Sequence, residues 1–153
     1  EKFTDTGLAS IAAGLAEGML VLGFHLGWCE PVGDAGLAAL STAFPSTLVH
    51  LELNLADCVK VGDAGLAALG AGLPPTLETF RLDLTRTQGG DTGLAALGAG
   101  LPSTLQNLEI NLPESRSVGD SGLAALGAGL PSTLQSLKLN LAGTRFGDSG
   151  LAA

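Results

Sequence analysis

Apolar and polar residues alternate strictly in a short segment in the first half of the chain. Leu51, Leu53 and Leu55 alternate with Glu52 and Asn54. A period of two places the three leucines on one face of an extended segment and the polar residues on the other. The pattern therefore predicts a half-buried β-strand. Equivalent segments span residues 19–29, 48–58, 77–87, 105–115 and 134–144, of which the first is less regular.

A helical pattern follows each of these segments. Leu66, Leu69 and Leu73 recur at i, i+3 and i+7, which places them on one side of a helix. Asp63 precedes them and suits the N-cap position, where its carboxylate would accept amide hydrogens of its own helix. Pro74 then prevents the helix from continuing, so we expect about ten helical residues in each unit.

The two patterns recur with a fixed period. An aspartate followed two positions later by Gly-Leu occurs at intervals of 29, 29, 28, 29 and 28 residues, at Asp5, Asp34, Asp63, Asp91, Asp120 and Asp148. A period of this size indicates one strand–helix unit that is copied and stacked. Short crossovers between parallel strands are expected to wind right-handed. We therefore expect residues 1–153 to form a single α/β solenoid of about five repeats.

The predicted helices carry small residues, among them Ala64, Gly65, Ala67 and Ala68. Strands stack about 4.8 Å apart, whereas packed helices usually need 8–10 Å, and this difference bends a solenoid. Because small side chains let the helices approach one another, we expect a comparatively flat arc.

The strand pattern LxxLxL, followed by a Cys, Thr or Ser turn and a GlyAspxGlyLeuxxLeu helix, resembles the leucine-rich repeat superfamily, and the period is most similar to that of its ribonuclease-inhibitor-like class. The resemblance implies a right-handed solenoid with a parallel sheet on the concave face and short helices on the convex face. The family's usual Asn or Cys position is occupied here by residues such as Ala56 and Pro113, and an additional leucine such as Leu55 precedes it. We interpret this departure as a longer strand.

Charge and composition exclude some classes of partner. The formal net charge is −8, from 15 acidic and 7 basic residues, and the six repeated aspartates account for most of the excess. Phosphate binding needs clustered Lys and Arg, so we expect no nucleic-acid partner. No apolar run reaches the roughly 18 residues of a membrane span, so we expect no membrane insertion.

The residues that usually carry chemistry are few. Cys29 and Cys58 occupy equivalent positions in successive repeats, where a disulfide is geometrically possible, but small residues at this position elsewhere favour two buried free thiols. With only His25 and His50 besides, we expect no metal site and no cofactor. Phosphate-binding, zinc-protease and nucleophile motifs are missing from the sequence, so we predict no catalytic residues and a non-enzymatic protein.

Candidate binding residues are those on the polar face of the predicted strands. One row across the strands holds Gly23, Glu52, Arg81, Glu109 and Lys138, and the next holds His25, Asn54, Asp83, Asn111 and Asn140. The first row is either a ladder of cross-strand ion pairs or the centre of a docking surface. The second is either a ladder of stacked amides or part of that surface. Trp28, at a strand end, either packs at the edge or anchors a partner, and His50 completes the candidate set.

Two further rows have structural explanations. Thr47, Thr76, Thr104 and Thr133 precede the strands, and a turn after each helix explains them better than an ordered-water surface. The aspartate row suits helix capping better than calcium, because no second carboxylate recurs nearby.

These patterns favour a scaffold that binds a protein partner through the concave sheet or its edge. Two alternatives are a small-GTPase regulator similar to the Ran GTPase-activating proteins, and a structural subunit of a large assembly. The helical pattern is incomplete at both ends, without capping units, so we expect a segment of a longer protein, or further repeats or subunits against the ends.

Overall fold

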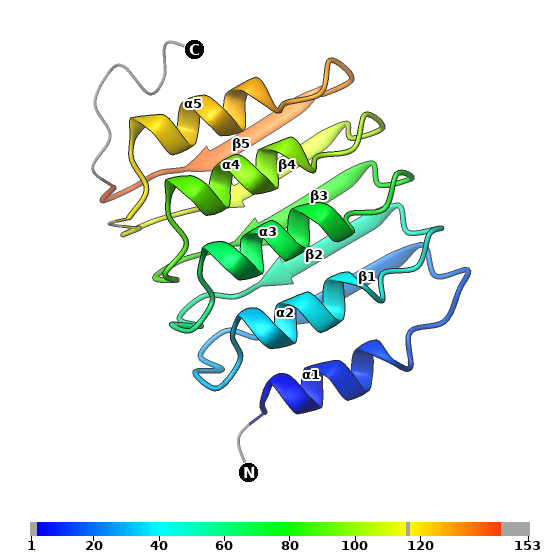
Figure 1. Cartoon of the computed structure of the whole chain (residues 1–153). Helices are drawn as coiled ribbons and strands as arrows, with labels where there is room; N and C mark the ends of the chain where they lie inside the picture. Colours follow the sequence, from blue (N-terminus) through cyan, green and yellow to red (C-terminus); the bar gives the residue numbers. More distant parts are fainter. Residues whose placement is uncertain (1–2, 116, 145–153) are drawn as a thin grey trace.

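The computed structural model describes residues 3–115 and 117–144 and contains helices and strands in strict alternation (Figure 1). In chain order the elements are α1 (Asp5–Ala12), β1 (Val21–His25), α2 (Asp34–Ser41), β2 (His50–Asn54), α3 (Asp63–Gly72), β3 (Thr79–Asp83), α4 (Asp91–Ala99), β4 (Asn107–Asn111), α5 (Asp120–Ala128) and β5 (Ser136–Asn140). The last aspartate of the repeat, Asp148, and the helical pattern at residues 151–153 lie outside the described residues.

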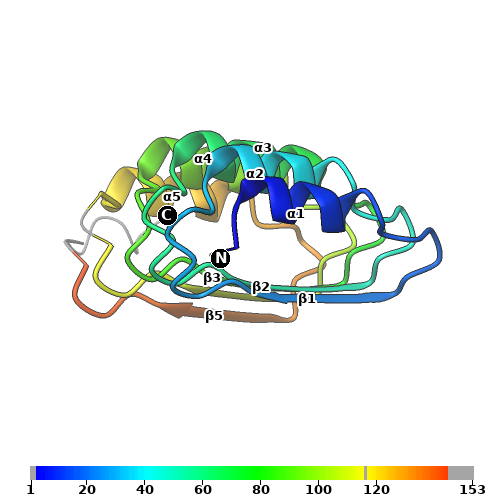
Figure 2. The same cartoon turned by 90° about the horizontal axis from the view of Figure 1, so that it is seen from below.

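The five strands form one parallel sheet in the order β1-β2-β3-β4-β5. Equivalent residues of successive repeats lie opposite each other, so that Glu52 pairs in register with Arg81 and Arg81 with Glu109. All helices cover the same face of the sheet, and each crossover is right-handed (Figures 1 and 2). The architecture is the predicted α/β solenoid.

The core lies between the sheet and the helices. In β2 the side chains of Leu51 and Leu53 are each 1% exposed, while His50 is exposed on the opposite face. Leu66 and Leu69 of α3 are buried against the sheet in the same way. Burial of these leucines repeats from unit to unit and joins them into one continuous core. The alternation in the sequence therefore predicted the inward face correctly.

The strands are shorter than the sequence suggested. Each has five residues, and β2 ends at Asn54. The backbone hydrogen bonds continue past this point, because Leu55 donates to the Asp83 carbonyl and Asp57 to the Thr85 carbonyl. The chain then turns sharply through a residue with positive φ, which ends the strand. The predicted longer strand was wrong, and the additional leucine instead begins the turn.

The predicted role of the repeated aspartates was also wrong. Asp63 is the first residue of α3 and makes no capping bond to its own helix, whose N-cap is Gly62. Its Oδ1 instead accepts the amide hydrogens of Gly90 and Gly93, at 2.7 and 3.0 Å, in the next repeat. The equivalent bonds join Asp5 to Gly33, Asp34 to Gly62 and Asp91 to Gly119, each at 2.7 Å. A glycine N-cap has no side chain to cap with, so the preceding repeat supplies the acceptor.

The helices approach one another as closely as their small residues allow. A Cβ atom added to Gly100 would lie 2.2 Å from the carbonyl oxygen of Gly70, and one added to Gly129 would lie 2.3 Å from that of Gly98. Side chains at these positions would force the helices apart. The described repeats stack with their helices side by side (Figures 1 and 2), and the flat arc expected from the small residues stays a prediction.

The threonine row also holds neighbouring repeats together. Thr76 Oγ1 donates to the carbonyl oxygens of Ser46 and Leu48, at 2.8 Å in both cases. Thr47, Thr104 and Thr133 make equivalent bonds to the preceding repeat. These hydroxyls form hydrogen bonds to the backbone of the preceding repeat, so they are not a free array on the surface.

Both cysteines are free thiols, but only Cys58 is buried; Cys29 is partly exposed, so the prediction of two buried thiols holds for one of them. The Cys58 thiol donates to the Leu26 carbonyl at 3.1 Å. Burial raises its pKa to about 11, because the thiolate would be poorly solvated.

Candidate functional site

The candidate site is the concave face, the side of the sheet that faces away from the helices. Its central row consists of Gly23, Glu52, Arg81, Glu109 and Lys138, one residue from each strand. Outward side chains alternate with inward apolar ones along the strands, so the row is fixed by the same register that builds the core.

Arg81 lies between two carboxylates in this row. Its guanidinium is 3.6 Å from a carboxylate oxygen of Glu52 and 3.6 Å from one of Glu109. Among the described residues, Lys138 makes no ion pair with Glu109. The predicted charge ladder therefore connects β2, β3 and β4 and does not extend to Lys138 on β5. Exposed pairs of this kind contribute about 0.2–1 kcal/mol each, so they stabilise the sheet little.

The second row does not form the ladder of stacked amides. Asn54 Oδ1 accepts the amide hydrogen of Ala56 at 3.0 Å, within its own repeat. Asp83 accepts from Thr85 in the same manner, at 2.9 Å from the backbone nitrogen. Asn140 makes the equivalent bond to Ala142 at 3.3 Å. Asn54, Asp83 and Asn140 thus begin the turns that end β2, β3 and β5. Asn111 cannot make this bond, because Pro113 has no amide hydrogen.

A third row lies in the turns and was missed in the sequence analysis. Its members share a left-handed backbone, with φ of 66°, 60°, 55°, 60° and 71° at Trp28, Asp57, Arg86, Glu114 and Gly143. Arg86 pairs with Asp57 at 3.6 Å and donates a 2.9 Å hydrogen bond from Nε to Glu114. The bond to Glu114 is the main reason that the pKa of Arg86 lies above its usual value. The sequence already contains this acid–Arg–acid pattern, three positions after Asn54, Asp83 and Asn111 in the aligned repeats.

Trp28 opens the turn row and projects into solvent. It is 75% exposed, so it does not pack at the sheet edge, which contradicts the structural alternative for this residue. His25 is also exposed, with Nε2 4.0 Å from a carboxylate oxygen of Glu52. His50 lies one strand away on the same face and is exposed as well.

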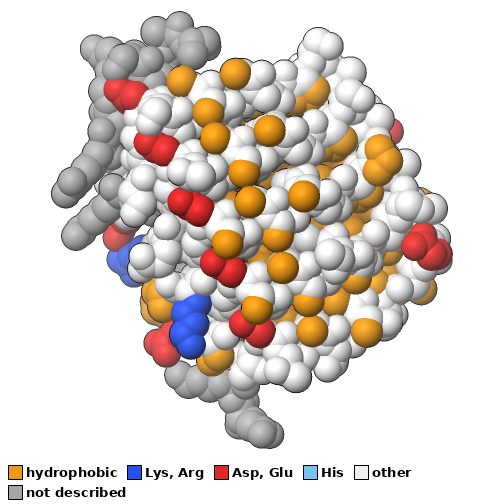
Figure 3. Space-filling model, viewed as in Figure 1, with side chains coloured by type: hydrophobic (Ala, Val, Ile, Leu, Met, Phe, Trp, Pro, Cys, Tyr) orange, Lys and Arg blue, Asp and Glu red, His pale blue; other side chains and the backbone are white. Residues whose placement is uncertain are grey.

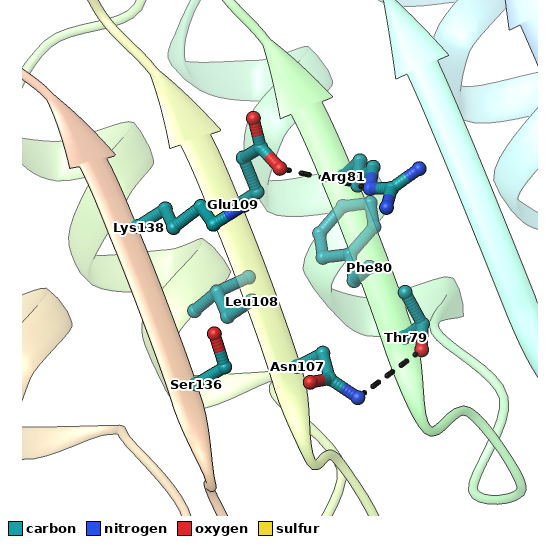
Figure 4. A pocket seen from close by; sticks show the side chains of 8 residues that line it. All are labelled: Thr79, Phe80, Arg81, Asn107, Leu108, Glu109, Ser136 and Lys138. Atoms are coloured by element: carbon teal, nitrogen blue, oxygen red, sulfur yellow. Dashed lines mark hydrogen bonds and ion pairs between the residues drawn. The ribbon is translucent and has the colours of Figure 1, made fainter.

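Three shallow hollows lie on the concave face, and Arg81 borders all of them. The hollow drawn in Figure 4, of about 280 Å³, lies between β3, β4 and β5 and is bordered by Thr79, Asn107, Glu109 and Lys138. The second, of about 100 Å³, is bordered by Glu52, Asn54, Asp83, Glu109 and Asn111. The third, of about 360 Å³, is bordered by Val21, Gly23, His50 and Glu52. Of the candidate residues, His25, Trp28 and Asn140 border none of the three.

The convex face differs strongly in chemistry. Apart from the aspartate that begins each one, helices α2 to α5 contain no charged residue. Figure 3 shows this face as small hydrophobic side chains with acidic groups in a row along one side. Those aspartates bond to neighbouring repeats, so varied polar groups for recognition are concentrated on the concave face.

Among residues 3–115 and 117–144, no three His, Cys, Asp or Glu side chains are grouped so that they could hold a metal ion. None of the helices in this part of the chain is long and apolar enough to cross a membrane.

Comparison with known proteins gives consistent results. A family profile described as Leucine Rich repeat matches residues 24–41, 47–70 and 133–153. No curated protein sequence matches the chain. The structure is similar to that of the leucine-rich repeat-containing protein LegL7 from Legionella pneumophila, with a TM-score of 0.55 and 18% sequence identity over 86% of this chain. The match covers 42% of the LegL7 chain, so this chain spans less than half the length of that protein. Three segments of the chain match leucine-rich repeats, and its stacked strand–helix units have the leucine-rich repeat fold.

Proposed function

We propose that this protein is a non-enzymatic interaction module that binds a protein partner through its concave face. The supporting observation is the contrast between the two faces. The concave face presents three rows of exposed polar, charged and aromatic side chains around hollows, whereas the helices present alanine and inter-repeat contacts. Varied side chains on a rigid sheet provide specificity, because the strand register fixes their spacing.

The ion pairs of the central row support this proposal over a purely structural role. Glu52, Arg81 and Glu109 have side chains that are 45%, 56% and 34% exposed, and their separations of 3.6 Å exceed ordinary hydrogen-bond lengths. Such contacts add little to stability, yet they keep charged groups ordered where a partner would meet them.

Affinity capture of partner proteins with two variants, one altered on the concave face and one on the convex face, tests the proposal. Arg81→Glu reverses a charge at the centre of the concave face, and Ala71→Glu introduces a charge at an exposed position of α3 on the convex face. We expect Arg81→Glu to change the amount of captured protein and Ala71→Glu to leave it unchanged, with both variants showing the circular dichroism spectrum of the unmodified chain. Loss with Ala71→Glu alone would contradict the proposal. Stimulation of GTP hydrolysis by a small GTPase would instead favour the regulatory alternative.

A further inference from the structure

The largest hollow of the concave face exists because one side chain is missing from the central row. The strands β2 to β5 place Glu52, Arg81, Glu109 and Lys138 in this row, but β1 places Gly23 there. A Cβ atom added to Gly23 would meet nothing within 4 Å. The hollow of about 360 Å³ is therefore bounded in part by bare backbone.

The borders of this hollow combine apolar and polar groups. Val21, which is 64% exposed, lies on the same strand two residues before Gly23. Leu22 and Leu51 contribute to the lining, while His50 and Glu52 stand on the neighbouring strand. An exposed valine beside an open backbone is suited to the apolar side chain of a partner, since its burial there would remove hydrocarbon surface from water.

The adjoining hollow of about 100 Å³ is acidic. Its border contains the carboxylates of Glu52, Asp83 and Glu109 and one cation, Arg81. Arg81 lies 3.6 Å from a carboxylate oxygen of Glu52 and 3.6 Å from one of Glu109, so it does not form a close bidentate pair with either. Asp83 is engaged with Thr85 and not with Arg81. The three carboxylates therefore exceed the cationic charge in this hollow and can accept hydrogen bonds from an additional cation.

The two hollows have a spacing that fits an extended peptide. They are offset by about one strand, ~4.8 Å, across the sheet and by about two residues, ~6.6 Å, along it. Side chains two residues apart in an extended chain project to the same side at a separation of about 6.6 Å. The diagonal between the two hollows is therefore about 8 Å. A peptide lying along it would address both hollows with residues two positions apart, because residues three positions apart point to opposite sides.

We propose that the concave face binds an extended, basic peptide segment of a partner protein, with an apolar side chain in the hollow beside Gly23 and a Lys or Arg side chain among Glu52, Asp83 and Glu109. This inference rests on the proposed function and specifies the chemistry of the partner. The formal charge of −8 of the whole chain would also attract a basic segment from a distance.

A phage-displayed library of random 12-residue peptides, selected on the immobilised full chain, tests the proposal. We expect the enriched peptides to share a Lys or Arg two positions from Leu, Ile, Val, Met or Phe. A synthetic peptide with the consensus sequence is then titrated against four proteins: the unmodified chain, Gly23→Val, the double variant Asp83→Asn with Glu109→Gln, and Glu78→Gln.

The variants are chosen to keep the fold. Gly23→Val fills the first hollow at a position where a Cβ has open space, and valine suits a strand. Asp83→Asn introduces the residue that the same row carries at Asn54 and Asn111. Glu78 is exposed and borders none of the three hollows, so Glu78→Gln is the matched control for charge.

We expect Gly23→Val and the double variant each to weaken peptide binding about tenfold or more, and Glu78→Gln to leave it unchanged. The double variant is also expected to reduce the salt dependence of binding. Peptides without a basic residue, binding that both hollow variants leave unchanged, or failure to enrich any peptide would overturn the inference. If Arg81→Glu changes the capture of the partner protein while peptide binding survives both hollow variants, the concave face remains the docking surface and only the basic peptide is wrong.

Discussion

The Oδ1 atom of Asp63 lies 2.7 Å from the backbone nitrogen of Gly90, the N-cap residue of the next helix. The repeated aspartate therefore caps the following repeat. Helix capping and the stacking of repeats depend on the same carboxylate, which explains why the aspartates that begin α2 to α5 are each preceded by a glycine.

Replacing Asp63 with alanine should lower the free energy of unfolding by about 0.5–2 kcal/mol, the usual effect of losing a cap. Asp63→Asn keeps an oxygen acceptor and should lose less. Urea denaturation of both variants checks this, with Glu78→Ala as an exposed control. Equal stability of Asp63→Ala and the unmodified chain would contradict the trans-repeat cap.

Acid should weaken the capping bond made by Asp91. The amide hydrogen of Gly119, and then the hydroxyl of Ser121, hold the pKa of Asp91 below its usual value of 3.8. A lowered pKa in the folded state gives stability that is present above the unfolded pKa and is lost as the pH falls through the folded pKa. Asp91→Asn should therefore be less stable at pH 7, yet lose less stability than the unmodified chain between pH 5 and pH 2. Parallel pH profiles for the two proteins would oppose this assignment.

Gly70 should not tolerate alanine, although alanine favours helices. Gly70 is buried in α3, and an added Cβ would lie 2.8 Å from the Ala96 carbonyl oxygen and 3.0 Å from the Leu97 Cα atom. We expect Gly70→Ala to destabilise the chain by about 1–3 kcal/mol through overpacking, which exceeds the gain of up to about 1 kcal/mol from helix propensity.

Thermal denaturation of Gly70→Ala separates packing from propensity. Helix propensity alone predicts a rise in melting temperature, whereas overpacking predicts a fall. A rise in melting temperature for Gly70→Ala would show that the helices are not in close contact at this point.

Trp28 should contribute more to binding than to folding. Its φ of 66° is unfavourable for a large side chain, and glycine occupies the equivalent position at Gly143. Trp28→Gly is therefore expected to raise the free energy of unfolding by up to about 1 kcal/mol while it weakens partner capture. Calorimetry and capture measured on the same preparation test both parts. A destabilised Trp28→Gly variant would indicate that the indole packs against the protein.

Much of the fold could be predicted from the sequence, because the signals involved are periodic. Alternating leucines specified the inward face of β2, and the spacing of the aspartates specified the number of residues in each unit. Assignment to the ribonuclease-inhibitor-like class stays a prediction.

The errors arose where a residue acts on another repeat or on its own turn. The Asp63 carboxylate binds Gly90, 27 positions away. A repeated sequence pattern does not show whether such a bond forms within one repeat or between neighbouring repeats. Asn54 binds the amide of Ala56 because the strand ends there, whereas alternation alone suggested that the strand continued to Leu55. The ion pairs of Arg86 could not be predicted from strand alternation, because Arg86 lies in the turn after β3.

The concave face as docking surface is the central claim, and carboxyl footprinting of the complex with a captured partner tests it most directly. Carbodiimide labelling followed by mass spectrometry compares Glu52 and Glu109 with Glu78 in the free and bound chain. We predict that binding lowers the labelling of Glu52 and Glu109 and leaves that of Glu78 unchanged. Unchanged labelling of Glu52 and Glu109 in a saturated complex would contradict the claim.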